Sequence, residues 1–330
     1  MATTLTSTTG FADLVQELVS ARAEEELRAR AVHAMPGLYV PARFVKGTNT
    51  LRYARYADLG VNTTALSEGL PPVDQALTIS SEYFTATQYG ATVAISDLAN
   101  IDSPHDLISI AAERVAYQAV RSMDQLVRDA IHTGANTDTT ATGGTAVWGA
   151  TASATLTANA ANSAVAVAGV LNGRMVKEIV ARLKGANVPQ FADGTYRAII
   201  HPSQEFDLIS DTAVNGWIEA RKYTDPSGIL TGEIGQFAGV RFIVSSDAKV
   251  YTTAGASAGN VYAALFLGPD AYTIGDSQTL QSYFVAPGGD HTDPLAQKAL
   301  LGYKMRFGAL PLQKAGARFR IVKTQATVGV

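Results

Sequence analysis

The chain contains no cysteine among its 330 residues. This absence excludes disulfide bonds, thiolate metal ligands and cysteine nucleophiles, and it fits assembly in a reducing cytoplasm. Charged residues are also scarce, at 17%, whereas hydrophobic residues make up an ordinary 47%. Charged residues usually account for about 25% of a soluble protein, and an isolated protein keeps most of them on its surface. We therefore expect other subunits to cover much of this surface.

Long apolar runs and basic clusters are missing as well. The longest apolar runs, near Ala164–Leu171 and Val261–Leu267, are far shorter than the roughly 20 residues of a membrane span. The first residues show no basic segment followed by an apolar one, so no signal peptide is visible. The net charge is −3 and no five basic residues are consecutive. The sequence therefore predicts neither membrane insertion nor sequence-specific DNA binding.

One catalytic pattern has to be weighed. Gly255 to Gly259 match G-x-S-x-G around Ser257, and Asp276 and His291 follow in the order of an α/β-hydrolase triad. A nucleophile elbow needs a helix directly after the turn, but the residues that follow are VYAALFLG, which is typical of a strand. A serine hydrolase using Ser257 is therefore the weaker alternative, and a hairpin turn is the better interpretation.

Metal and cofactor patterns are not found. The histidines are isolated, none pairs with another at i,i+4 spacing, and no glycine-rich phosphate fingerprint occurs. They are His33, His105, His132, His201 and His291. We therefore predict no catalytic, cofactor-binding or metal-binding residues and no cofactor.

The longest predicted element is a helix from Ser103 to Gly134. Ser103 suits the N-cap, Pro104 the first helical position and Asp106 a capping box, while Gly134 suits the end. An apolar, alanine-rich stripe recurs at spacings of three and four, which predicts close packing against a flat surface such as a sheet. The stripe consists of Ile108, Ala112, Val115, Ala119, Met123, Leu126 and Ala130. On the polar side, Asp124 and Arg128 are expected to pair.

A long hairpin is predicted before this helix, over residues 44–96. Its first strand reads TNTLRYARYADL, and its second runs from about Gln75 to Ile95. A two-stranded ribbon of this length is only marginally stable alone in water. We therefore expect the hairpin to lie on another copy of the chain. A further helix is expected from Gly10 to about Ala31.

The second half of the chain alternates helices and strands. After a low-complexity segment over 135–163, in which a loop or short hairpin with Trp148 is expected, we predict a helix from Val165 to Gly185 with Leu171, Met175, Ile179 and Leu183 buried. A strand then ends at the corner His201-Pro202, and a short helix follows with Ser203 as its N-cap. The remaining predicted strands are Val240–Ser245, Val261–Leu267, Ala299–Gly308 and Arg318–Lys323.

In this order of elements the chain resembles the major capsid proteins of tailed double-stranded DNA bacteriophages. The pieces that carry the resemblance are Leu66-Ser67-Glu68-Gly69, then EYFTATQYGATVAISDLA leading into the long helix, and the ending PLAQ followed by LGYKM at Leu301–Met305. The resemblance covers nearly the whole chain, and its specificity lies in the combination and order of these patterns.

The resemblance implies an α+β fold with named parts. Residues 1–43 would be the N-terminal arm and 44–96 the extended loop, a β-hairpin. The peripheral domain would comprise 97–163 and 291–330, with the spine helix at 103–134. Residues 164–290 would be the axial α/β domain. The polar face of the spine helix, from Glu113 to Asp129, would line the shell interior or a subunit contact.

The resemblance also implies a function and partners. The chain would be a non-enzymatic subunit that forms pentamers and hexamers of an icosahedral capsid around the double-stranded DNA genome. It would occur in the virion capsid after assembly in the host cytoplasm. A portal, possibly a decoration protein and, because only about 43 residues precede the hairpin, a separate scaffolding protein would be its partners. A cross-link through Lys46, at the base of the hairpin, is not expected. The alternative within the fold is an encapsulin-like nanocompartment shell protein.

Overall fold

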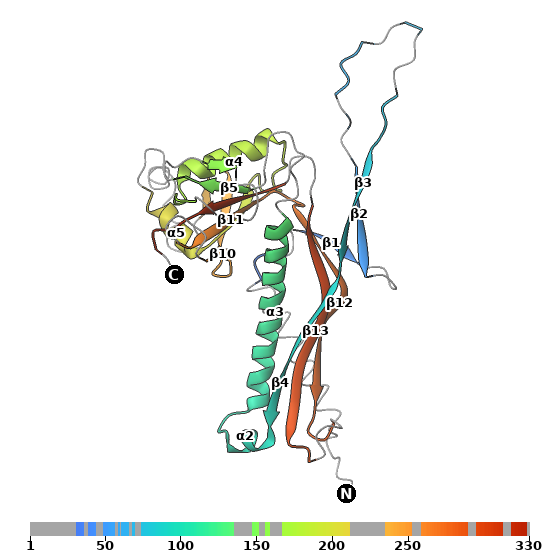
Figure 1. Ribbon diagram of the computed structural model, residues 1–330, viewed down its shortest axis with the longest axis vertical. Helices are drawn as coiled ribbons and strands as arrows, with labels where there is room; N and C mark the ends of the chain where they lie inside the picture. The colour runs from blue at the N-terminus through green and yellow to red at the C-terminus, as the bar shows by residue number, and fades with distance from the viewer. Residues whose placement is uncertain are drawn as a thin grey trace.

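The computed structural model in Figure 1 shows an elongated subunit with three groups of strands. The described residues are 31–35, 39–43, 49–56, 59, 61–65, 68–69, 74–134, 147–151, 156–158, 167–211, 235–252, 259–289, 295–312 and 318–328. Within these ranges the strands form a four-stranded sheet, an eight-stranded sheet and a separate two-stranded hairpin. The predicted helix from Gly10, the residues around Lys46, and both Ser257 and His291 lie outside the described residues.

The four-stranded sheet has the order β1-β12-β13-β4. Its strands are β1 (Tyr39–Arg43), β12 (Tyr272–Val285), β13 (Lys298–Pro311) and β4 (Thr87–Ser96). β12, β13 and β4 run antiparallel, whereas β1 joins the edge of β12 in parallel. The contact between β4 and β13 is close, since a Cβ on Gly302 would lie 2.8 Å from the carbonyl oxygen of Ala91.

The long helix α3 (Leu107–Gly134) lies along this sheet (Figure 1). Its alanine-rich side packs against aromatic and aliphatic residues of β13, among them Leu301, Tyr303 and Met305. Buried alanines such as Ala112 and Ala119 leave room for these larger side chains. The predicted packing of an alanine-rich stripe on a flat surface is therefore confirmed, and 28 residues give α3 a length of about 42 Å.

The start of this helix differs from the prediction. A separate short helix, α2 (Asp97–Asp102), ends at Ser103, and α3 begins at Leu107 rather than at Ser103. Asp106 acts as the N-cap, because its carboxylate accepts from the amide of Ile108 at 3.1 Å and its carbonyl accepts from Ile110 at 3.2 Å. Ser103 instead accepts from the amide of His105 in the turn between the helices.

The eight-stranded sheet has the path β6-β5-β14-β11-β7-β9-β8, with β10 paired to β11. Its strands are β5 (Val147–Ala150), β6 (Leu156–Ala158), β7 (Tyr196–Ile200), β8 (Gln236–Phe237), β9 (Val240–Val244), β10 (Val250–Tyr251), β11 (Val261–Leu267) and β14 (Phe319–Thr324). β11 is buried along its whole length and coincides with its prediction, as expected for a continuous apolar run at the centre of a sheet.

The two faces of this sheet belong to different cores. On one face, helix α4 (Gly173–Gly185) buries Met175, Ile179 and Leu183 against residues such as Phe266. On the other face, residues that include Leu265 and Ile321 join the same core as α3 and the four-stranded sheet. A continuous apolar core therefore links the two sheets.

Both helices of this region begin differently from the predictions. α4 starts at Gly173, eight residues later than predicted, because Asn172 accepts from the amide of Met175 and caps it. α5 (Pro202–Ile209) is capped by His201 rather than by Ser203. The Nδ1 atom of His201 accepts from the amide of Ser203 at 3.1 Å, and the side chain of Gln204 accepts from the amide of His201 at 3.3 Å. The predicted strand-to-helix corner at His201-Pro202 is confirmed.

The hairpin consists of β2 (Thr50–Tyr56) and β3 (Ile79–Thr85), which pair only with each other among the described strands. Residues 87–96, predicted as the end of its second strand, form β4 of the four-stranded sheet instead. The change occurs at Ala86, whose amide donates to the carbonyl of Asn49 at 2.9 Å and closes the base of the hairpin.

Sheet membership also departs from the expected division at 163/164 and 290/291. β12 belongs to the four-stranded sheet although it falls within 164–290. β5, β6 and β14 belong to the eight-stranded sheet although they fall within 97–163 and 291–330. The chain crosses between the two sheets more often than predicted, because strands far apart in sequence pair with each other, as Val147 of β5 does with Ile321 of β14 and Tyr39 of β1 with Tyr272 of β12.

Candidate assembly surfaces

The hairpin projects away from both sheets in Figure 1. Several of its described apolar side chains are exposed, which is costly for a lone subunit in water. They are Leu59, Val61, Leu77, Ile79 and Tyr83. Val61 is 92% exposed, so nothing in the described part of the same chain shields it. The arrangement provides an extended ribbon with apolar contacts available to a partner.

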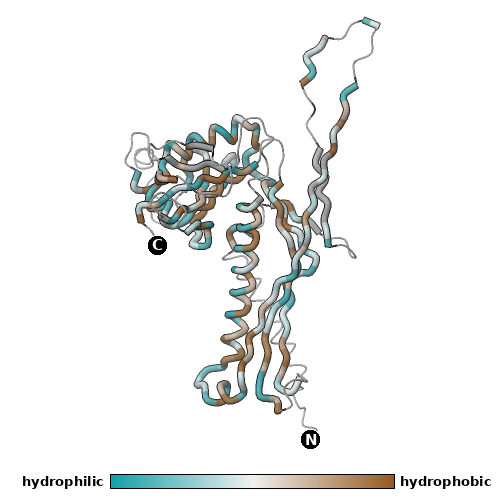
Figure 2. Tube along the Cα trace, viewed as in Figure 1, coloured by the Kyte–Doolittle hydropathy of each residue, from teal (hydrophilic) through white to brown (hydrophobic). Residues whose placement is uncertain are grey.

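A second apolar surface lies at the opposite end of the subunit, on α2. No residue of α2 is buried, and Leu98 and Ile101 are 65% and 76% exposed. These two residues share one side of the helix at i,i+3 spacing. Leu295 is also exposed (75%), and the amide of Asp97 donates to the carbonyl of Gln297, which ties α2 to the segment just before β13. Figure 2 shows hydrophobic stretches at this end.

A six-residue helix that buries no side chain gains almost no stability from tertiary packing. Isolated helices of this length are unstable in water, even with a good cap such as Ser96, whose hydroxyl accepts from the amide of Ala99. We therefore define Leu98 and Ile101 as the α2 patch, a surface suited to burial against another molecule.

A polar junction connects the middle of α3 to the turn between β9 and β10. The carboxylate of Asp247 accepts from the Arg121 guanidinium at 2.9 Å and from the Gln125 amide at 3.0 Å. The backbone carbonyl of Asp247 accepts from Arg128 at 2.6 Å. Lys249 forms an ion pair with Asp129 at 2.9 Å. The polar face of the helix therefore holds the eight-stranded sheet in position.

The carboxylates of this junction are stabilised in their charged form. Burial alone would raise the pKa of Asp247, but hydrogen bonds from Arg121 and Gln125 and the nearby positive charges outweigh it and lower the pKa. The pKa of Asp129 is lowered in the same way, since hydrogen bonds from Arg128 and Lys249 outweigh its burial. The predicted pair of Asp124 with Arg128 does not form, because Arg128 bonds to Asp129 and Asp247 instead.

Two buried titratable groups near this junction have no hydrogen-bond partner among the residues that the structure describes. Both ring nitrogens of His132 are unpaired, and burial lowers its pKa well below the ordinary value. Lys323 is fully buried, its ammonium lies 4.6 Å from the centre of the Tyr251 ring, and burial lowers its pKa to about 8. In the described part of the chain neither group forms an ion pair, so both are costly to bury when charged.

The predicted candidates for chemistry are not brought together by the described residues. Asp276 lies in β12, where it pairs across the sheet with Phe307, whereas Ser257 and His291 are outside the described ranges. The residues after Gly259 form β11, a strand and not the helix that a nucleophile elbow needs. Among the described residues no group of three metal-ligating side chains occurs, and no helix has the length and apolar character to cross a bilayer.

Sequence reasoning missed the residues that define these surfaces. Asp247 lies about 120 residues from its partners on α3, so no local pattern could reveal the junction. α2 had a usable signal, because Ser96-Asp97 precedes Leu98 and Ile101 at helical spacing. We predict no element for residues 97–102, which lie between the strand that ends at Ile95 and the helix that begins at Ser103.

Comparison with known proteins supports the architecture. A family model described as "Phage capsid protein" matches residues 80–319, well over half of the chain. Comparison with curated proteins finds no match.

Similar solved structures are phage capsids. The capsid of Ralstonia phage GP4 matches with a TM-score of 0.66 and 14% identity, over 89% of this chain and 88% of that one. The capsid of the cyanophage P-SCSP1u matches with a TM-score of 0.63 and 14% identity, over 88% and 87%. The capsid of the Helicobacter pylori bacteriophage KHP30 matches with a TM-score of 0.61 and 10% identity, over 86% of each chain. At such low identity these matches show a shared fold, and the match to the family model shows that the chain belongs to the phage capsid protein family.

Proposed function

We propose that this capsid protein forms pentamers and hexamers of an icosahedral shell that encloses double-stranded DNA. The observation that carries the proposal is the hairpin of β2 and β3, which extends from the subunit with exposed apolar side chains and has no strand partner among the described residues. A hairpin of this kind is stabilised when it lies on a neighbouring subunit. Head-to-tail contacts of this type close into rings and shells.

The sheets support a division into two domains. We infer that the peripheral domain consists of the four-stranded sheet with α2 and α3, and the axial domain of the eight-stranded sheet with α4 and α5. Strand pairing within each sheet supports this division better than it supports the domain boundaries expected from the sequence, at 163/164 and 290/291. The hairpin of residues 49–86 is then the extended loop.

The α2 patch supplies a second subunit contact in this proposal. It lies at the far end of the peripheral domain from the hairpin base, so the two surfaces engage different neighbours (Figure 1). Two separate heterologous contacts are what a closed shell requires, since one contact alone gives a ring or a filament.

A hairpin deletion tests the proposal. Tyr56 pairs directly with Ile79, so residues 57–78 can be replaced by the two-residue turn Asn-Gly without changing the strand register. We expect the shortened chain to fold with an unchanged thermal transition but to form no shells in sedimentation and electron microscopy. The matched control replaces exposed Val61 by Thr within the full-length hairpin and still assembles. Shells of normal size from the shortened chain would refute the role of the hairpin.

We further propose that assembly takes place in the host cytoplasm around a separate scaffolding protein, with a portal at one vertex. The family membership and the mildly acidic net charge of −3 support a container that does not bind DNA tightly. Uniform shells of native size from the purified chain alone would count against a separate scaffold. The polar junction at Asp247 is a natural place for the two domains to pivot during maturation, and identical α3 geometry in immature and mature shells would exclude this.

We propose no catalytic role for the chain. The strand that follows Gly259 supports this, because it places no helix amides behind Ser257. Labelling by a fluorophosphonate probe that is abolished in Ser257→Ala would overturn it.

A further inference from the structure

The buried side of α3 contains one carboxylate. Asp124 is only 3% exposed and lies in line with Val120, Val127 and Ile131 on the side that packs into the core. Such a position normally takes an apolar residue, since burying a charge is costly unless it is fully hydrogen-bonded. The partners of Asp124 therefore indicate why a charge is present there.

All described partners of Asp124 come from the short segment of residues 31–35. One carboxylate oxygen accepts from the backbone amides of His33 and Ala34 at 2.7 and 2.9 Å, and the other lies 2.8 Å from Nδ1 of His33. A carboxylate can only accept, so Nδ1 of His33 carries the proton in this contact. His33 is itself 1% exposed, so the whole contact is shielded from water. Hydrogen bonds to a charged group are strong in such a shielded site.

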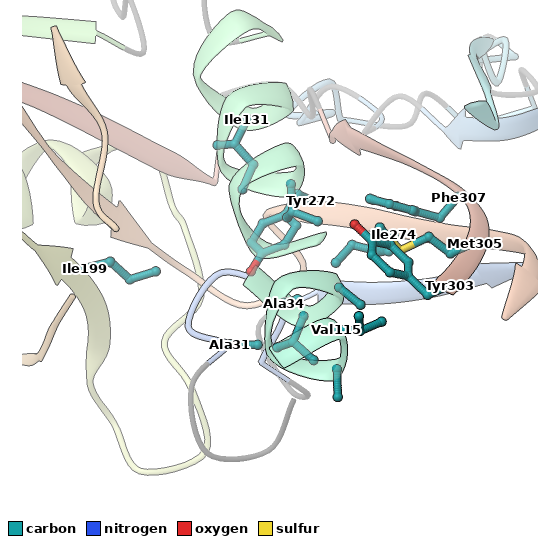
Figure 3. Close-up of a cluster of buried hydrophobic side chains, with 14 of the residues drawn as sticks. Ala31, Ala34, Val115, Ile131, Ile199, Tyr272, Ile274, Tyr303, Met305 and Phe307 are labelled. Atoms are coloured by element: carbon teal, nitrogen blue, oxygen red, sulfur yellow. The ribbon is translucent and has the colours of Figure 1, made fainter. Parts of the chain in front are cut away.

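The same segment is held from the opposite side by the sheet. The hydroxyl of Tyr272, at the start of β12, donates to the carbonyl oxygen of His33. Ala31 and Ala34 belong to the core that contains Val115 of α3, and Figure 3 shows these alanines beside the helix. A few residues later the chain forms β1, whose residue Tyr39 pairs with Tyr272. The segment is therefore inserted between the helix and the sheet.

Apolar contacts alone would not fix the position of residues 31–35 along the axis of α3. Ala31 and Ala34 belong to the same core as Ala112, Ala116 and Ala119 of α3, where small residues recur every three or four positions. A shift by one helical turn, about 5.4 Å, would replace one small residue by another. The same shift would leave the Asp124 carboxylate buried without partners. A single buried polar group can set register in this way.

We propose that Asp124 and His33 form an arm latch that fixes residues 31–35 at one position along α3, and so holds the subunit in the form that enters the shell. The second half of this statement rests on the proposed shell function, whereas the latch itself does not. Asp124 is in this view a positioning residue, and its replacement releases the segment without removing the core around it.

Hydrogen exchange of the unassembled full chain tests the latch directly. In Asp124→Ala, exchange of the His33 and Ala34 amides is expected to be at least tenfold faster than in the original chain. Asp124→Asn keeps an acceptor oxygen for these amides and is expected to restore part of the protection. Val127→Ala is the matched control, because it removes a fully buried side chain from the same side of α3 and touches no hydrogen bond of the latch. Unchanged protection of the two amides in Asp124→Ala would overturn the proposal.

A milder variant keeps the test valid if Asp124→Ala fails to fold. Tyr272→Phe removes only the hydroxyl that donates to His33. We expect the exchange of the His33 and Ala34 amides to rise several-fold while the aromatic packing stays intact. No change in either variant would mean that the apolar contacts alone hold the segment.

Assembly separates the latch from general stability. Asp124→Ala is expected to lower the yield of shells at least tenfold, with partial rescue in Asp124→Asn, whereas Val127→Ala assembles normally at a temperature where it is folded. Equal losses in Asp124→Ala and Val127→Ala would show that only stability matters and would overturn the role of the latch in assembly. Fast amide exchange combined with normal shells would support the latch and refute its role in assembly.

Discussion

The double substitution Leu98→Asp and Ile101→Asp should abolish shell formation while leaving the subunit folded. Full burial of a leucine or isoleucine side chain is worth about 1.5–3 kcal/mol. Because these side chains are 65% and 76% exposed in the subunit, about 1–2 kcal/mol from each remains to be gained at a contact. Loss of both therefore weakens each contact by about 2–4 kcal/mol, or roughly 30- to 1,000-fold, before the cost of burying two carboxylates is added.

The same structure predicts a negligible effect on the isolated subunit. No residue of α2 is buried, so the free energy of unfolding measured with urea should change by less than about 0.5 kcal/mol. The control is Ala99→Asp, which adds one of the two negative charges to the same short helix at an exposed position off the α2 patch. Sedimentation velocity should show shells for the control and only small species for the double variant. Shells at the original yield, or a loss of stability above about 1 kcal/mol, would refute the assignment of the α2 patch to assembly.

Three further predictions concern the buried groups at the junction of the two sheets. Lys323→Met should stabilise the subunit to urea by about 1–3 kcal/mol at pH 7, because it removes a buried ammonium without an anion. Because the pKa of Lys323 is lowered, the original chain gains stability as the pH rises from about 8 toward 10.5. The advantage of the variant should therefore shrink over that range, and an equal advantage at pH 7 and pH 10 would contradict the reasoning. Below about pH 6.5 the unfolded chain binds a proton on His132 that the buried ring does not bind, so the free energy of unfolding of the original chain should fall by up to about 1.4 kcal/mol per pH unit. His132→Leu should remove this pH dependence. Parallel stability curves for both proteins from pH 5 to 7 would exclude this. Asp247→Asn should cost no more than about 1 kcal/mol at pH 7, since the Arg121 side chain of the pair is half exposed. This cost should disappear below about pH 4, because the Asp247 carboxylate, whose pKa is lowered, is then protonated in the original chain as well; an equal cost at neutral and at acidic pH would argue against the junction.

Local chemistry accounts for the elements that sequence reasoning placed well. β11 is a continuous apolar run and lies at the centre of its sheet, as such runs do. The long helix follows from a repeating small-residue stripe, and the hairpin from two β-prone segments around a turn-rich tip. The capsid fold itself was predicted from the order of these elements and is confirmed by the family match.

The errors have physical causes. β12 was not predicted, because Gly275-Asp276 resembles a turn and the second half of the strand alternates buried and exposed positions with many polar residues. Ser103 has the residue type of an N-cap, but Asp106, three residues on, binds the first free amide of α3. Competition between two good caps cannot be resolved from residue types alone.

The functional surfaces were the least predictable part. Asp124 was placed on the polar face of the helix, since a charge is expected to face water, but its partner His33 lies 91 residues away. The polar junction at Asp247 and the buried Lys323 likewise depend on contacts between distant segments. Local periodicity carries no information on such pairs.

Electron cryomicroscopy of the expressed chain, alone and together with its scaffolding partner, tests the central claim most directly. The account predicts closed icosahedral shells of pentamers and hexamers in which the hairpin of residues 49–86 lies across a neighbouring subunit and the α2 patch is buried between subunits. Particles that remain monomeric under both conditions would contradict it. So would closed shells in which the hairpin contacts only its own subunit.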